Sequence, residues 1–192
     1  HNIFYNEIEP KFQELNMQIV AVQKEYMKAL MEVFPNERFF PDANSTLRVT
    51  YGQVRGYEPR DGVYYETTTY LDGVMEKYVP GDYEFDVPQK LRDLYEAKDY
   101  GQYGENGKMP VNILSTNHMT GGNSGSPIVD SNGNMIGLAF DTTWEGTMSD
   151  LYFDADIVRS IAVDIRYVLF IIDKYAGAKN LIDEMMFVHP KK

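Results

Sequence analysis

Residues 116–141 read TNHMTGGNSGSPIVDSNGNMIGLAFD, and the interpretation of the whole chain depends on this stretch. At its centre, residues 121–127 (GGNSGSP) place Ser124 in a loop of small residues, with an apolar pair directly after it. Glycines permit backbone torsions that other residues avoid, so this loop can turn sharply. Asn132-Gly133 then separates that apolar pair from a second apolar run at 135–140, which predicts a β-hairpin.

Ser124 is therefore a candidate nucleophile on the loop that leads into a hairpin. The glycine-rich turn would let the backbone amides of Gly122 and Ser124 point inward together as an oxyanion hole. This is the chymotrypsin-type arrangement, and it differs from the strand-to-helix elbow of α/β-hydrolases. A plain Gly-Ser connection between two strands, without chemistry, is the alternative interpretation.

Length, charge and cysteine content bound the remaining possibilities. The 192 residues suit one domain plus an appendage. A net charge of −11 argues against nucleic acid as a partner, because phosphate binding needs a basic surface. No stretch is long and apolar enough to span a bilayer, and without cysteine there is no disulfide framework. Because His1 falls inside a helical pattern, we expect a piece of a longer protein.

Hydrophobic periodicity predicts a mainly β chain with flanking helices. Apolar residues that recur every three or four positions predict an amphipathic N-terminal helix. This apolar stripe consists of Phe12, Leu15, Ile19, Val22, Tyr26, Ala29 and Val33. Strands are predicted at 47–51, 62–67, 109–115, 128–129, 135–140 and 149–153. A short helix or turn is predicted at 70–75, a helix within 83–103, and a final helix at 161–186, interrupted at Gly177. This order of elements suits the second β-barrel of a chymotrypsin-like protease. We expect that barrel at 39–192 and a separate helical segment at 1–38.

A serine nucleophile needs a base that accepts its proton, and the chain has three histidines. His1 is the first residue, and His189 lies in a charged tail, where we expect plain surface. His118 belongs to the segment that leads into the nucleophile turn. Because it is so close to Ser124 in sequence, its ring could hardly approach the Ser124 hydroxyl in line. The chain therefore carries a nucleophile without a convincing base, as expected of a fragment.

Asp141 ends the strand after the nucleophile hairpin, where chymotrypsin-type folds border their specificity pocket. A carboxylate there could bind a cationic group such as a free α-amine, or it could simply cap the turn before Thr142.

Residues 130–134 resemble the start of a calcium loop, but Met135 stands where glycine is expected, and a hairpin explains Asn132-Gly133. We therefore expect no metal and no other cofactor.

The sequence resembles the S46 dipeptidyl peptidases, the group that contains dipeptidyl peptidases 7 and 11. The likeness covers nearly the whole chain from about residue 39, in the motifs at 41–48, 57–64, 116–127, 136–141 and 163–174. The resemblance implies a chymotrypsin-like double β-barrel with an inserted helical domain, whose last helix would be residues 3–34. It also implies release of dipeptides from free N-termini, in the periplasm or at the cell surface of a Gram-negative bacterium.

The resemblance assigns Ser124 as nucleophile, Asp141 as the residue that binds the substrate α-amine, and Thr142 as a determinant of preference at the second substrate residue. In these peptidases glycine at that last position accompanies hydrophobic preference, and arginine or sometimes serine accompanies preference for Asp or Glu. Threonine departs from both patterns: its hydroxyl could bind a carboxylate and its methyl group could line an apolar pocket. The interpretation leans toward Asp/Glu preference, with hydrophobic preference as the alternative.

The catalytic histidine and aspartate of these peptidases belong to the N-terminal barrel and match nothing in this chain, so the chain alone should be inactive. The expected partners are peptide substrates and the remaining barrel and helical domain of the same polypeptide, with a homodimer as one option for the whole protein. A non-catalytic binding or scaffold domain with a protease-like barrel is the alternative from another functional class.

Overall fold

The computed structural model describes residues 2–37, 39 and 45–188. The chain forms two compact units, His1–Pro41 and Asp42–Lys192; the boundary expected from the sequence was at 38/39. The assignment of the first unit to a helical domain stays a prediction. No helix among the described residues has both the length and the apolar character needed to cross a membrane.

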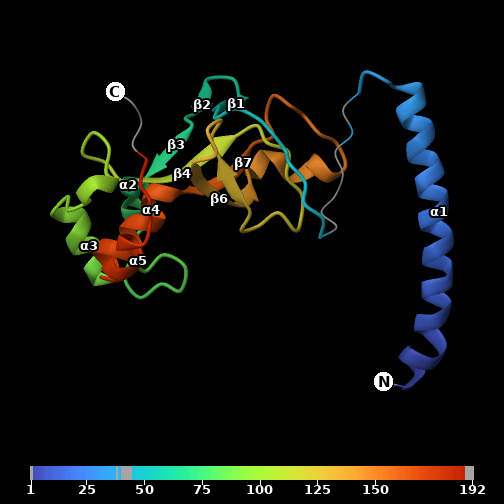
Figure 1. Ribbon diagram of the computed structural model, residues 1–192, viewed down its shortest axis with the longest axis horizontal. Coiled ribbons are helices and arrows are strands. Elements are labelled where there is room, and N and C mark those ends of the chain that lie inside the picture. The colour runs from blue at the N-terminus through green and yellow to red at the C-terminus, as the bar shows by residue number, and fades with distance from the viewer. Residues whose placement is uncertain (1, 38, 40–44, 189–192) are drawn as a thin grey trace. The chain divides into compact units, whose positions relative to one another are not determined.

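The second unit is built on a five-stranded antiparallel sheet (Figure 1). Its order is β3 (Thr68–Tyr70), β4 (Pro110–Ser115), β7 (Ser160–Asp164), β6 (Met135–Thr142) and β5 (Pro127–Val129). The predicted hairpin is present as β5 and β6, joined by a turn in which Gly133 has φ +83°. A separate hairpin pairs β1 (Tyr57–Arg60) with β2 (Val63–Tyr65).

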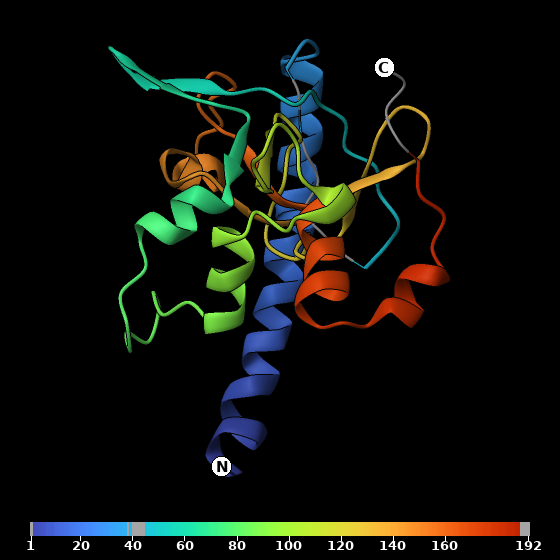
Figure 2. The same cartoon turned by 90° about the vertical axis from the view of Figure 1, so that its left-hand side faces the viewer.

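Short helices gather on one side of the sheet (Figure 2). They are α2 (Leu71–Glu76), α3 (Gln89–Glu96), α4 (Ile165–Phe170), the π-helical turn Ile171–Tyr175 and α5 (Lys179–Asp183). Phe170 and Leu71 are completely buried between them, in a cluster that also holds Val87, Leu91, Tyr100, Tyr103, Met109 and Val111. This core anchors one end of the sheet, and the fold class expected from the sequence, mainly β with flanking helices, is confirmed.

Three predicted elements are wrong in type or extent. Residues 47–51 form no strand; the strand lies later, at Tyr57–Arg60, where Pro59 is tolerated because β1 belongs only to a two-stranded hairpin. Residues 149–153 are not a strand but the end of a 3₁₀ helix, Trp144–Asp150, and the chain after it. The final helix begins at Ile165, because the residues before it form β7, which alternates buried and half-buried side chains.

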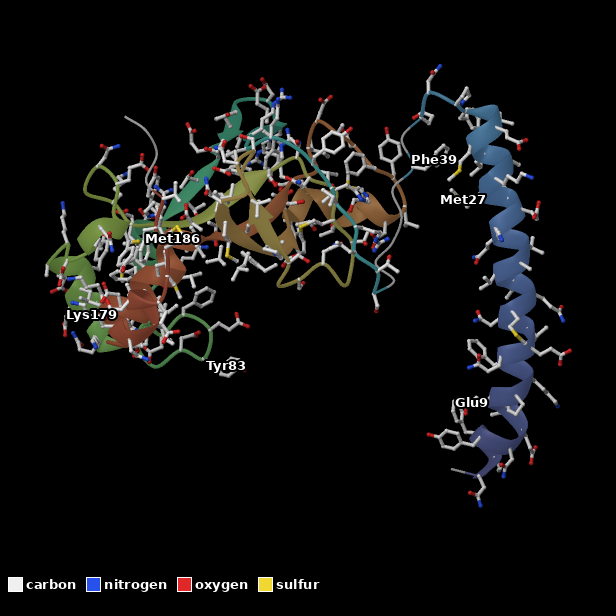
Figure 3. The ribbon with its side chains drawn as sticks, viewed as in Figure 1. Glu9, Met27, Phe39, Tyr83, Lys179 and Met186 are labelled. Atoms are coloured by element: carbon white, nitrogen blue, oxygen red, sulfur yellow. The ribbon has the colours of Figure 1, made fainter. Side chains whose placement is uncertain are left out.

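The first unit is a single helix, α1 (Glu9–Val33), preceded by a π-helical turn, Phe4–Ile8. Pro10 lies in its first turn, directly after the π-helical turn, the kind of local irregularity that accommodates a proline within a helical segment. Figure 3 shows side chains radiating from α1 in every direction, and the apolar stripe predicted from the sequence is exposed, from Phe12 to Val33. The helix is confirmed, and its apolar stripe needs a partner for stability in water.

Candidate active site

The nucleophile turn lies between β4 and β5 and is closed by its own hydrogen bonds. The backbone N–H of Thr120 donates to Oδ1 of Asn123 (2.9 Å), and the N–H of Asn123 donates to the carbonyl of Thr120 (3.2 Å). Gly122 and Gly125 have φ of +99° and +85°, in the left-handed region that favours glycine. The two glycines therefore permit the turn that presents Ser124.

Strand β6 holds the turn from one side. The N–H of Gly125 donates to the carbonyl of Ala139 (2.7 Å), and the N–H of Ala139 donates to the carbonyl of Ser126 (2.9 Å). The exposed Ser124 hydroxyl donates to the carbonyl of Phe140 at 3.2 Å. A carbonyl cannot remove the proton of a hydroxyl, so this arrangement presents Ser124 without activating it.

A β-bulge in β6 turns Asp141 toward the same side as Ser124. Ala139 pairs with Ala162 and Asp141 pairs with Ile161, so Phe140 is an extra residue in the ladder. Without the bulge, the two-residue period would place Asp141 on the buried face with Gly137 and Ala139. With it, both Phe140 and Asp141 are exposed, and the carboxylate becomes available to a ligand.

Ser124, Asp141 and Thr142 line one pocket of about 150 Å³. Gly121 also lines this pocket, whereas Gly122, the predicted oxyanion-hole residue, contributes the turn in the backbone beside it. Oδ1 of Asp141 accepts the backbone N–H of Thr142 at 2.8 Å, which fixes the carboxylate relative to the strand. The three side chains singled out in the sequence are thus brought together.

One wall of the pocket was missed by sequence reasoning. It comes from the 3₁₀ helix Trp144–Asp150, through Thr147, Ser149 and Asp150. We predicted a strand over part of this segment. The signal that could have found it is Gly146 with the Ser149-Asp150 pair, which together favour a turn over a strand.

His118 is engaged elsewhere. Its ring meets the ring of Phe153 edge-on at 5.1 Å between centroids, and its backbone N–H donates to Oγ1 of Thr50. His1 and His189 lie outside the described residues. Within the part of the chain that the structure describes, no group of three or more acidic or histidine side chains could hold a metal ion.

Comparison with known proteins gives one consistent family. The family described as Peptidase S46 matches residues 3–187. An Asp/Glu-specific dipeptidyl-peptidase of Flavobacterium psychrophilum is 67% identical over 96% of this chain and 26% of its own length. A dipeptidyl-peptidase 7 of Phocaeicola vulgatus is 55% identical over 87% of this chain and 23% of its own length.

A solved structure supports the same grouping. DPP11 of Porphyromonas endodontalis in complex with the dipeptide Arg-Asp superimposes with a TM-score of 0.79 at 50% identity, over 85% of this chain and 24% of that one. The chain thus spans about a quarter of the length of the relatives it matches. The match to the family over nearly the entire sequence shows that this chain belongs to the peptidase S46 family.

Proposed function

We propose that this chain is the nucleophile-bearing C-terminal part of a serine dipeptidyl-peptidase that releases dipeptides from free N-termini. The observation that carries the proposal is the single pocket lined by Ser124, Asp141 and Thr142 in a chain of the S46 family. A serine for attack, a carboxylate for an amine and a hydroxyl for the second substrate side chain are the groups that this reaction needs.

Ser124 attacks the carbonyl that follows the second substrate residue, and the backbone amides of Gly122 and Ser124 hold the resulting oxyanion. The positive φ of Gly122 supports this role, because it turns the local backbone in a way that a side chain would oppose. For attack, the hydroxyl must leave the carbonyl of Phe140 and give its proton to a base. That base and its orienting acid come from the rest of the polypeptide.

Asp141 binds the free α-amine of the substrate. It lies in the same pocket as Ser124, on the strand that also holds the nucleophile turn. This rigid connection fixes the span between amine and nucleophile, and that span limits cleavage to dipeptides. A blocked amine would lose the ion pair and would also leave the carboxylate facing an uncharged group.

Thr142 selects the second substrate residue, and we propose that Asp and Glu are preferred. Thr142, Thr147 and Ser149 line the pocket, and each carries a hydroxyl group of the kind that can donate to a carboxylate. The Flavobacterium psychrophilum relative is named Asp/Glu-specific, which favours the same preference. Hydrophobic preference is the second candidate, because the Phocaeicola vulgatus relative is named dipeptidyl-peptidase 7 and the threonine methyl group could line an apolar pocket.

The rest of the same polypeptide is the proposed partner of this chain, and the periplasm or the cell surface is its proposed location. The remaining barrel would supply the histidine and aspartate, and the remaining helical domain would cover the apolar stripe of α1. We also propose that the whole protein is a homodimer. The competing proposal from another functional class is a non-catalytic binding or scaffold domain.

The test uses the full-length gene product, with a full-length Ser124→Ala variant and the 192-residue chain as controls. Release of a fluorophore is measured from dipeptide conjugates that end in Asp, Glu, Leu or Phe, with free or acetylated amines. We expect cleavage only by the unmodified full-length protein, only with free amines, and fastest after Asp or Glu. A folded full-length protein that cleaves none of these conjugates would contradict the peptidase proposal and favour the scaffold.

A further inference from the structure

Arg159 is a fully buried cation next to the pocket. Its side chain is 2% exposed and donates to four backbone carbonyls, of Gly56 (3.2 Å), Ala155 (2.9 Å), Asp156 (3.0 Å) and Val158 (2.8 Å). Within the described residues, no carboxylate pairs with it at ion-pair distance. Because several backbone groups share one guanidinium, Arg159 joins the turn before β7 to the segment before β1.

Tyr57 extends this connection toward the pocket. Its buried ring lies under the guanidinium of Arg159, at 5.5 Å from the ring centroid. Its hydroxyl donates to Oε2 of Glu145 at 2.6 Å. Burial, together with this bond to a carboxylate, raises the pKa of Tyr57 to about 12, so the hydroxyl remains a donor across the physiological range.

Glu145 lies in the first turn of the 3₁₀ helix Trp144–Asp150, which forms one wall of the pocket. A 3₁₀ helix of seven residues has little stability of its own, so tertiary contacts must hold it in place. The backbone of Arg159 also contributes: its carbonyl accepts the N–H of Thr143 (2.9 Å), and its N–H donates to Oγ1 of Thr143 (3.3 Å). The wall is thus held at Thr143 and at Glu145.

We propose that Arg159, Tyr57 and Glu145 form a positioning network that fixes the Trp144–Asp150 wall and thereby sets how tightly the pocket holds the dipeptide. The proposal rests on the proposed function. None of the three residues lines the pocket, so they act through Thr147, Ser149 and Asp150. The nucleophile turn is held separately, by β6, so the network should govern substrate binding and leave the chemical step largely unchanged.

The test is Tyr57→Phe in the full-length protein, which keeps the ring under Arg159 and removes the hydroxyl that bonds Glu145 and Thr143, the two residues at which the wall is held. Tyr65→Phe is the matched control, because its ring contacts that of Tyr57 edge-on (5.2 Å) and its side chain is partly exposed. A hydrogen bond to a charged group carries roughly a tenfold effect or more. We therefore expect Tyr57→Phe to raise KM about tenfold with kcat within about twofold, and Tyr65→Phe to change neither.

Glu145→Ala and the double variant complete a mutant cycle, because alanine has no side-chain acceptor for the hydroxyl of Tyr57. Since both single changes break the same bond, the double variant should show about the same KM as Tyr57→Phe. Independent KM effects that multiply would overturn the network, and so would a Tyr57→Phe enzyme whose kcat falls while its KM stays constant, because that pattern implicates the chemical step.

Hydrogen exchange at residues 144–150 of the full-length variants separates this proposal from the proposed function. We expect faster exchange there in Tyr57→Phe than in Tyr65→Phe, whether or not the protein cleaves peptides. An active wild-type enzyme with unchanged KM and unchanged exchange in Tyr57→Phe overturns the network alone. An inactive wild-type protein overturns the proposed function, and the exchange result then decides whether the wall is held as described.

Discussion

Replacing Asp141 by Asn probes the carboxylate that we assign to the substrate amine. In the structure, Oδ1 of Asp141 accepts the backbone N–H of Thr142 at 2.8 Å. The amide oxygen of asparagine can accept the same bond, so the local backbone geometry should survive. The substitution therefore exchanges a charge for a dipole at the place where the α-amine is expected to bind.

The expected loss follows from the strength of a charge-assisted hydrogen bond, about 1.5–3 kcal/mol. Because about 1.4 kcal/mol corresponds to a factor of ten, kcat/KM should fall by roughly 10- to 100-fold. Asp141 is exposed, and Asp150, which lines the same pocket, still attracts a cation. Both features favour the lower half of that range.

The assay compares two substrates of the full-length enzyme, a dipeptide conjugate with a free α-amine and the same conjugate with hydrogen in place of the amine. Asp141→Asn should slow only the first substrate, so the preference for a free amine should collapse. Asp61→Asn, in the exposed turn between β1 and β2, removes the same charge outside the pocket and should change neither rate. Equal losses on both substrates, or no loss on either, would refute amine binding by Asp141.

Three further predictions test how the fold is held. Asp164→Ala removes both the cap of α4, in which Asp164 accepts the N–H of Arg166, and the ion pair between the two side chains. It should lower the free energy of unfolding by about 2 kcal/mol or more in a denaturant melt. Glu105→Ala, which breaks only an exposed ion pair, should change it by less than about 1 kcal/mol. Gly137→Ala should destabilise by about 1–3 kcal/mol, because its Cβ would lie 2.7 Å from a carbonyl of β7; an unchanged melting temperature would contradict the packing. Since the pKa of Tyr57 rises from 10.0 to about 12 on folding, its contribution to stability is fully present below pH 10 and is lost as the pH rises through 12. In Tyr57→Phe the melting temperature should therefore fall less steeply with pH over that range than in the wild type. Identical pH profiles of the two proteins would count against the raised pKa of Tyr57.

Much of the site was predictable because its signals are local. The Asn132-Gly133 pair determines a tight turn, and Asp130 reinforces it by accepting the N–H groups of Asn132 and Asn134. The glycines around Ser124 adopt the positive φ values that only glycine takes easily. Such features depend on a few consecutive residues, so the sequence displays them directly.

The rest depends on contacts between distant residues. Ile161 and Val163 fit a helix as well as a strand, and only the pairing of β7 with β4 and β6 makes them a strand. The bulge at Phe140, which turns Asp141 outward, is a property of the paired ladder and leaves no mark in β6 alone. The pocket wall at Trp144–Asp150 is held by Tyr57, 88 residues away from Glu145 in sequence.

The measurement that tests the central claim most directly is covalent labelling of the full-length protein with a fluorophosphonate, which reacts with activated serines. Peptide mapping should place one adduct on Ser124, with loss of activity in proportion to labelling. Ser124→Ala should remain unlabelled, and so should the 192-residue chain, whose described residues leave the Ser124 hydroxyl bonded to a carbonyl. An active enzyme that carries its adduct on another serine would contradict the account.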